Sequence, residues 1–264
     1  MLPESNETLM YKLIILEHIG KEAEISKLLN SLIQNRNKVL DKWYYIILRN
    51  TAHFFSYEQA YHNLQKCLDY FSKCGTVFEQ ATILNNISVI QIWNGSKTYI
   101  DAEKTIKKAI KKFYEIGSNE IFESYYNYGT LNYLKGNYQK AIEYFEYALE
   151  EVPETLTMDV TLLHINKRIC ECAINPEKIS DLEIYILNSL NKSEILQDPW
   201  VRFQLEYNLK NIEIYNNGKT DVHPSEIFLP NNDRNTTTLT VFDVLNIHND
   251  YIPICLSLSP NWRY

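Results

Sequence analysis

The stretch that decides the fold runs from Phe122 to Glu154 and reads FESYYNYGTLNYLKGNYQKAIEYFEYALEEVPE. Small residues stand where one helix can cross another closely: Gly129, Ala141 and Ala148. A glycine inside a helix costs about 1 kcal/mol relative to alanine, so Gly129 suggests that a large neighbour approaches the backbone there. Gly136-Asn137 is typical of a turn between helices, and Pro153 cannot continue a helix. The stretch therefore predicts two antiparallel helices joined by a short turn.

This unit closely resembles one tetratricopeptide repeat, a helix–turn–helix whose family period is 34 residues. The matching residues are Tyr125, Gly129, Tyr133, Gly136, Tyr138, Ala141, Phe145, Ala148 and Pro153. We expect Tyr125, Tyr138 and Phe145 to fill the gaps beside the small residues. Asn132 departs from the family pattern, which prefers an aromatic residue at that position. The resemblance implies that hairpins of this kind stack into a right-handed solenoid.

Two weaker units precede it, at residues 43–71 and 81–117. Two triplets take the places of Ala141, Phe145 and Ala148: Ala60, Leu64 and Cys67 in one unit, and Ala102, Ile106 and Ala109 in the other. The second helices of both units end alike, at Gly75 and Gly117, which are 42 residues apart. The period is therefore nearer 40 than 34, which predicts longer helices and connections, and residues 96–99 look like a small insertion.

The rest of the first 218 residues also favours helices. Residues 7–35 predict a pair with Gly20 in the turn, 157–175 and 180–191 predict a degenerate pair, and 198–216 predict a long helix without an obvious mate. We therefore expect an all-α, right-handed superhelical solenoid over residues 1–218, with about five hairpins plus a lone helix.

The character of the chain changes after Gly218. Residues 219–264 begin as a polar, loop-like segment and continue with two apolar stretches, 239–245 and 251–258. The last helix of a solenoid exposes an apolar face unless something covers it. We expect this mixed tail to pack on that helix; the alternative is a segment that binds a partner.

Composition narrows the function. The chain of 264 residues has a formal net charge of −7, which disfavours direct binding of nucleic acid, because that needs a basic surface. No apolar run approaches the ~18 residues of a membrane helix, and residues 1–5 lack the features of a signal peptide. Five cysteines without framework spacing predict reduced thiols. The expectation is a cytoplasmic protein that does not bind a membrane.

One segment of this acidic chain is basic. It contains a run of lysines: Lys104, Lys107, Lys108, Lys111 and Lys112. At helical spacing most of them fall on one side. They can form a solvated helix face or a docking patch for an acidic partner.

Catalytic motifs are missing from the sequence. Seven scattered glycines make no phosphate loop, and the six histidines form no metal-binding pair. Cys170 and Cys172 with His164 could suggest a metal, but residues i and i+2 of a helix point about 200° apart. We expect no catalytic residue, no metal and no cofactor.

A row of asparagines is the strongest candidate for a ligand site. Asn127 stands two residues before Gly129, and Asn86, Asn166 and Asn208 hold the corresponding places in other units, at spacings of 41, 39 and 42 residues. In tetratricopeptide families the first helices line a concave groove, and peptide-binding members often place asparagines there. A carboxamide both donates and accepts hydrogen bonds, so a row of them can pair with an extended peptide backbone. Such an asparagine can instead bond the adjacent hairpin.

The predicted groove residues are therefore Asn86, Asn127, Asn166 and Asn208, with Tyr125 and Tyr126 beside them. The predicted function is a non-catalytic scaffold for a protein or peptide partner, acting as an adaptor or sensor. The period and the asparagines also resemble bacterial quorum-peptide receptors, here without an output half, and the repeat sensors of bacterial signalling ATPases. Sequence leaves the oligomeric state open.

Overall fold

Helical hairpins follow one another along the chain in the computed structural model, which describes residues 6–18, 21–34, 41–52, 55–192, 195 and 199–216. The α-helices are α1 (Asn6–His18), α2 (Glu22–Gln34), α3 (Asp41–Asn50), α4 (Tyr57–Cys74), α5 (Val77–Trp93), α6 (Tyr99–Glu115), α7 (Ile121–Leu134), α8 (Tyr138–Glu151), α9 (Thr157–Ile174), α10 (Ile179–Leu190) and α12 (Pro199–Asn216). Short 3₁₀ turns, η3 (Ser96–Thr98) and η4 (Pro176–Lys178), precede α6 and α10. Those ranges contain no strand, so the predicted all-α solenoid of hairpins is confirmed.

The helices begin and end at residues whose chemistry explains the boundaries. Thr76 and Glu79 form a reciprocal capping box at the start of α5, with each side chain bonded to the other residue's backbone N–H. Gly136, in the turn between α7 and α8, has φ +77°, a left-handed conformation that glycine adopts without strain. The second helix of this hairpin ends at Glu151, two residues before Pro153.

Small residues do mark the helix crossings. All three triplets predicted to be equivalent are completely buried: Ala60, Leu64, Cys67; Ala102, Ile106, Ala109; and Ala141, Phe145, Ala148. Asn132, the departure from the repeat pattern, is buried and donates from Nδ2 to the Tyr128 carbonyl oxygen at 2.7 Å. A bond to its own helix thus satisfies the amide where an aromatic ring was expected.

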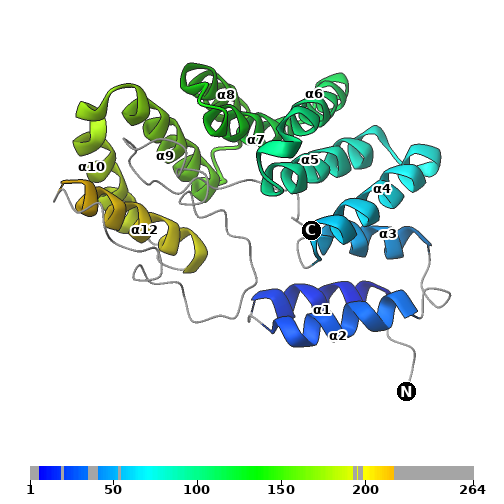
Figure 1. Cartoon of the computed structure of the whole chain (residues 1–264). Helices are drawn as coiled ribbons and strands as arrows, with labels where there is room; N and C mark the ends of the chain where they lie inside the picture. Colours follow the sequence, from blue (N-terminus) through cyan, green and yellow to red (C-terminus); the bar gives the residue numbers. More distant parts are fainter. Residues whose placement is uncertain are drawn as a thin grey trace.

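The helices are arranged as an arc (Figure 1). The first helices α5, α7 and α9 lie on its inner side, and the second helices α6, α8 and α10 lie on its outer side. The helix expected to have no mate, α12, packs against α10 and buries Val201, Leu205 and Ile212. Because α10 already pairs with α9, α12 is the expected lone helix that follows the hairpins among the described helices.

Two predictions concern residues outside the described ranges: the turn at Gly20 and the tail at 219–264. Within those ranges no helix combines the length and the apolar character needed to cross a membrane.

Candidate interaction surfaces

The predicted asparagines lie on four different helices of the arc. Asn86 is on α5, Asn127 on α7, Asn166 on α9 and Asn208 on α12, and each side chain is at most 2% exposed. A buried amide needs hydrogen-bond partners, because leaving it unsatisfied costs about 1–3 kcal/mol. The hydrogen-bond partners of these four amides therefore show which structural role the asparagines have.

Two of them connect neighbouring hairpins. Asn127 Nδ2 on α7 donates to Asn85 Oδ1 on α5 at 3.0 Å, and Asn166 Nδ2 on α9 donates to the Tyr126 hydroxyl on α7 at 2.9 Å. Bonding to the adjacent hairpin, the alternative role for these residues, is thus present for Asn127 and Asn166. Contact with a ligand stays a prediction for all four asparagines.

The acceptor on α5 is Asn85, which the sequence reasoning passed over in favour of its neighbour Asn86. Its Oδ1 also accepts from the Ser124 hydroxyl at 3.0 Å. Ser124 and Asn127 are three residues apart and therefore face the same way on α7. Ser124 and Asn127 stand about one repeat period, some 40 residues, after Asn85. This spacing of polar residues in the sequence could have indicated that they bond to Asn85.

The two predicted tyrosines lie on different sides of α7. Tyr126 is buried beside Phe145, with ring centroids 5.9 Å apart, and its hydroxyl accepts the bond from Asn166. The half-buried Tyr125 packs with Tyr147 and Tyr144 of α8, at centroid distances of 5.7 and 6.1 Å. The structure therefore places Tyr126 with the asparagine row and Tyr125 toward the outer helices.

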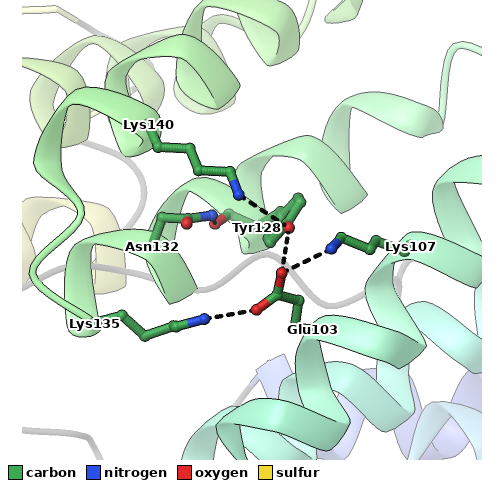
Figure 2. A network of polar contacts seen from close by, with 6 residues as sticks. All are labelled: Glu103, Lys107, Tyr128, Asn132, Lys135 and Lys140. Atoms are coloured by element: carbon green, nitrogen blue, oxygen red, sulfur yellow. Dashed lines mark hydrogen bonds and ion pairs between the residues drawn. The ribbon is translucent and has the colours of Figure 1, made fainter.

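A second polar cluster joins three helices around Glu103 on α6 (Figure 2). Glu103 Oε1 accepts from Lys107 Nζ and from the Tyr128 hydroxyl, both at 2.8 Å, and Oε2 accepts from Lys135 Nζ at 2.6 Å. The hydrogen bond from Lys107, followed by the one from Lys135, lowers the pKa of Glu103 to about 2. The carboxylate is therefore ionised throughout the physiological pH range.

Tyr128, on α7, lies at the centre of this cluster. Burial, with the hydrogen bond to Glu103 next, raises the pKa of its hydroxyl to about 12, so the group stays a neutral donor. The ammonium groups of Lys107 and Lys140 lie 5.7 and 5.3 Å from its ring centroid, within range for cation–π attraction. Because Lys140 belongs to α8 and Glu103 to α6, Tyr128 ties both outer helices to α7.

The lysine run is divided by its contacts. Lys112 Nζ donates to Gln80 Oε1 on α5 at 2.8 Å, and Lys107 belongs to the Glu103 cluster. Lys104, Lys108 and Lys111 are exposed on the outer side of α6. Only Lys104, Lys108 and Lys111 thus form a solvated helix face.

The cysteines and histidine of α9 do not form a common site. Burial raises the pKa of the Cys170 thiol, and it raises the pKa of Cys172 to about 11. The His164 ring packs on Tyr185 at a centroid distance of 5.8 Å. No group of three His, Cys, Asp or Glu side chains placed to hold a metal ion occurs within the described ranges.

A pocket of about 350 Å³ lies between α2 and α4. Its lining combines apolar, amide and imidazole side chains: Leu29, Asn30, Ile33, Phe55, Gln59, His62 and Asn63. Its volume lies near the lower end of the range for small-molecule sites, and its lining contains no charged side chain.

Comparison with known families agrees with the repeat geometry. The tetratricopeptide repeat family model matches residues 122–155, the α7–α8 hairpin. A search of curated proteins finds no match to the chain. Repeats of this family generally mediate contacts between proteins, which supports a scaffold role. The α7–α8 hairpin is thus a tetratricopeptide repeat, and further helical hairpins stack on either side of it.

Proposed function

We propose that this chain is a non-catalytic scaffold, an adaptor or sensor subunit, whose inner helices α5, α7 and α9 bind an extended segment of another protein. The observation that carries the proposal is the row of carboxamides on three successive inner helices, at Asn86, Asn127 and Asn166. An extended backbone presents N–H and C=O groups in alternation, and a carboxamide complements both. Binding of this kind depends little on the sequence of the segment, so neighbouring side chains such as Tyr126 supply selectivity.

The bonds between hairpins support this role by fixing the spacing of the row. The Asn127–Asn85 bond connects α7 to α5, and the Asn166–Tyr126 bond connects α9 to α7. Helices held at a set distance lose little conformational freedom when a ligand binds, and such preorganisation favours affinity. The same residues therefore hold together the stack of inner helices on which the segment would bind.

A peptide sensor is the second candidate. The bonded pairs of inner-helix residues are 42 and 40 residues apart, in accord with the period near 40 that suggested a likeness to peptide-sensing repeat domains. Such a sensor uses the same inner helices but binds a short free peptide.

The test begins with a phage-displayed library of short peptides selected on the wild-type chain. The affinity of an enriched peptide is then measured by fluorescence anisotropy on the double variant Asn86→Ala, Asn127→Ala, alongside its melting temperature. The proposal predicts an affinity roughly tenfold lower or more, because each lost hydrogen bond is worth about 0.5–1.5 kcal/mol.

The matched control is Gly129→Ala, which perturbs the packing of α7 on α8 but leaves the carboxamides in place. We expect it to melt at a lower temperature and still bind the peptide normally where it is folded. Normal affinity in the folded double variant would remove Asn86 and Asn127 from the binding surface and leave them a purely structural role.

A further inference from the structure

The outer side of α6 is basic. Lys104, Lys108 and Lys111 are spaced i, i+4, i+7, so they share one face, opposite the buried Ala102 and Ala109. Two of these side chains are largely in solvent, at 68% exposure for Lys104 and 77% for Lys111. Their ion pairs, to Asp101 and Glu115 of the same helix, are long, at 3.7 and 3.8 Å. Exposed pairs of this kind are weak, so the lysines remain available to a partner.

The outer side of α8 is acidic and has the same spacing. Glu143, Tyr147 and Glu150 follow one another at i, i+4, i+7, and all three are exposed. The sequence of α8 contains four glutamates and one lysine. Glu146 pairs with Lys167 of α9 at 2.7 Å, but the ion pairs of the described residues include none between α6 lysines and α8 glutamates.

Two exposed tyrosines accompany these charges. Tyr114 at the end of α6 is 78% exposed, and Tyr147 is 47% exposed. Tyr147 does not project freely, since its ring packs on Tyr125 and on Tyr144, with 5.7 Å between centroids in each case. A tyrosine held in place by its neighbours loses little freedom on binding, and tyrosine is among the residues enriched at the energetic centres of interfaces.

The basic and acidic faces are held in a fixed relation. Glu103 of α6 and Lys140 of α8 both contact the Tyr128 hydroxyl, at 2.8 and 3.5 Å (Figure 2). Both outer helices also pack on α7, which lies between them in the arc (Figure 1). The outer surface therefore presents a positive helix and a negative helix, which α7 holds in a fixed relation.

We propose that the outer face of α6 and α8 binds the same face of a second copy of this chain. A two-fold axis between the helices would set α6 of each copy against α8 of the other. Lysines would then meet glutamates on both sides of the axis, with the exposed tyrosines between them. Such an isologous contact needs a self-complementary surface, and this face carries lysines on one helix and glutamates on the other.

The charges favour a second copy over other occupants. A polyanion such as nucleic acid would be attracted to α6 but repelled by α8 and by the net charge of −7. A uniformly acidic protein segment meets the same repulsion from α8. A partner that carries one acidic and one basic helix fits, and a second copy has both of these helices. The contact is independent of the inner-helix binding proposed above.

The test is sedimentation equilibrium of the full chain and of two charge-reversal variants, with circular dichroism as the check on folding. The wild type is expected to associate into dimers as its concentration rises to about 100 µM. In the variant K108E/K111E both α6 and α8 are acidic, and in E143K/E150K both are basic. Helices of like charge would face each other in the dimer, so each variant alone should associate at least tenfold more weakly than the wild type. An equimolar mixture of the two should form a heterodimer again.

Three outcomes would overturn the proposal. These are a wild type that stays monomeric, reversal variants that associate as the wild type does, and folded variants whose mixture remains monomeric. A monomeric wild type that binds poly-glutamate, with binding lost in K108E/K111E, would assign α6 to an acidic partner instead.

Discussion

The ring of Phe145 on α8 lies directly against the backbone of Gly129 on α7. A Cβ atom added at residue 129 would lie 2.7 Å from Phe145 Cε1 and 2.8 Å from Cδ1, closer than real side-chain contacts allow. The buried ring cannot move aside as the end of a flexible surface side chain would, since Phe145 is completely buried. This contact sets the distance between the two helices of the best-defined repeat.

A larger residue at 129 should therefore strain the hairpin. We expect Gly129→Leu to lower the free energy of unfolding by about 1–3 kcal/mol through overpacking. Thermal melting checks this. In a double-mutant cycle, Phe145→Leu should relieve part of the effect, because it shortens the group that occupies the space. An unchanged melting temperature for Gly129→Leu would show that the contact does not limit the packing.

The bond between Asn127 and Asn85 should stabilise the stack of hairpins. We expect Asn127→Ala to cost about 1–3 kcal/mol, because it removes a buried donor from its acceptor. The coupling energy with Asn85→Ala, measured by chemical denaturation, should be about 0.5–1.5 kcal/mol. The control Asn119→Ala, in an exposed turn, should change stability little. Additive effects of the two buried changes would contradict the bond.

The Glu103 cluster predicts a dependence of stability on acid. The pKa of Glu103 falls from 4.5 to about 2 in the folded chain. A group whose pKa is depressed by folding adds stability above its unfolded pKa, and that stability disappears as the pH falls through the folded value. The gap in melting temperature between wild type and Glu103→Gln should therefore be full at neutral pH and shrink between pH 4.5 and about 2.

The size of this gap is limited because the Glu103 side chain is 22% exposed, so solvent screens its ion pairs. Glu115→Gln is the matched control, since its carboxylate is half exposed and 3.8 Å from Lys111. We expect the melting temperature of this variant to stay close to that of the wild type at neutral pH. If the gap between wild type and Glu103→Gln stayed constant from neutral pH down to about pH 2, the cluster would not stabilise the fold.

The sequence predicted the fold well because packing constraints leave local traces. A glycine inside a helix and alanines at fixed spacing point to helix crossings, and the buried triplets and the Gly129–Phe145 contact lie where they were expected. The apolar pattern of α12 shows which face of the helix is buried, but it does not show that α10 covers that face.

The polar contacts were harder to foresee. Asn85 and Asn86 are adjacent, so on a helix they point about 100° apart, and periodicity alone could not choose between them. Lys135 lies 32 residues from Glu103 and reaches it only through the stacking of hairpins. The separation of Tyr125 from Tyr126 likewise depends on where α8 and α9 pack around α7.

The segment at 219–264 stays a prediction, and truncation tests it. If these residues cover the apolar face of the last helix, a chain ending at residue 218 should aggregate, because apolar surface becomes exposed. If they bind a partner instead, the truncated chain should stay soluble. At low protein concentration it should elute as a monomer in size-exclusion chromatography.

The central claim is that the inner helices bind an extended polypeptide segment. Its most direct test is photo-crosslinking of a selected peptide that carries benzoylphenylalanine, followed by mass spectrometry of the crosslinked chain. Our account predicts crosslinks on α5, α7 and α9, near Asn86, Asn127 and Asn166, and their loss when unlabelled peptide competes. Competable crosslinks confined to the outer helices α6, α8 and α10 would contradict it.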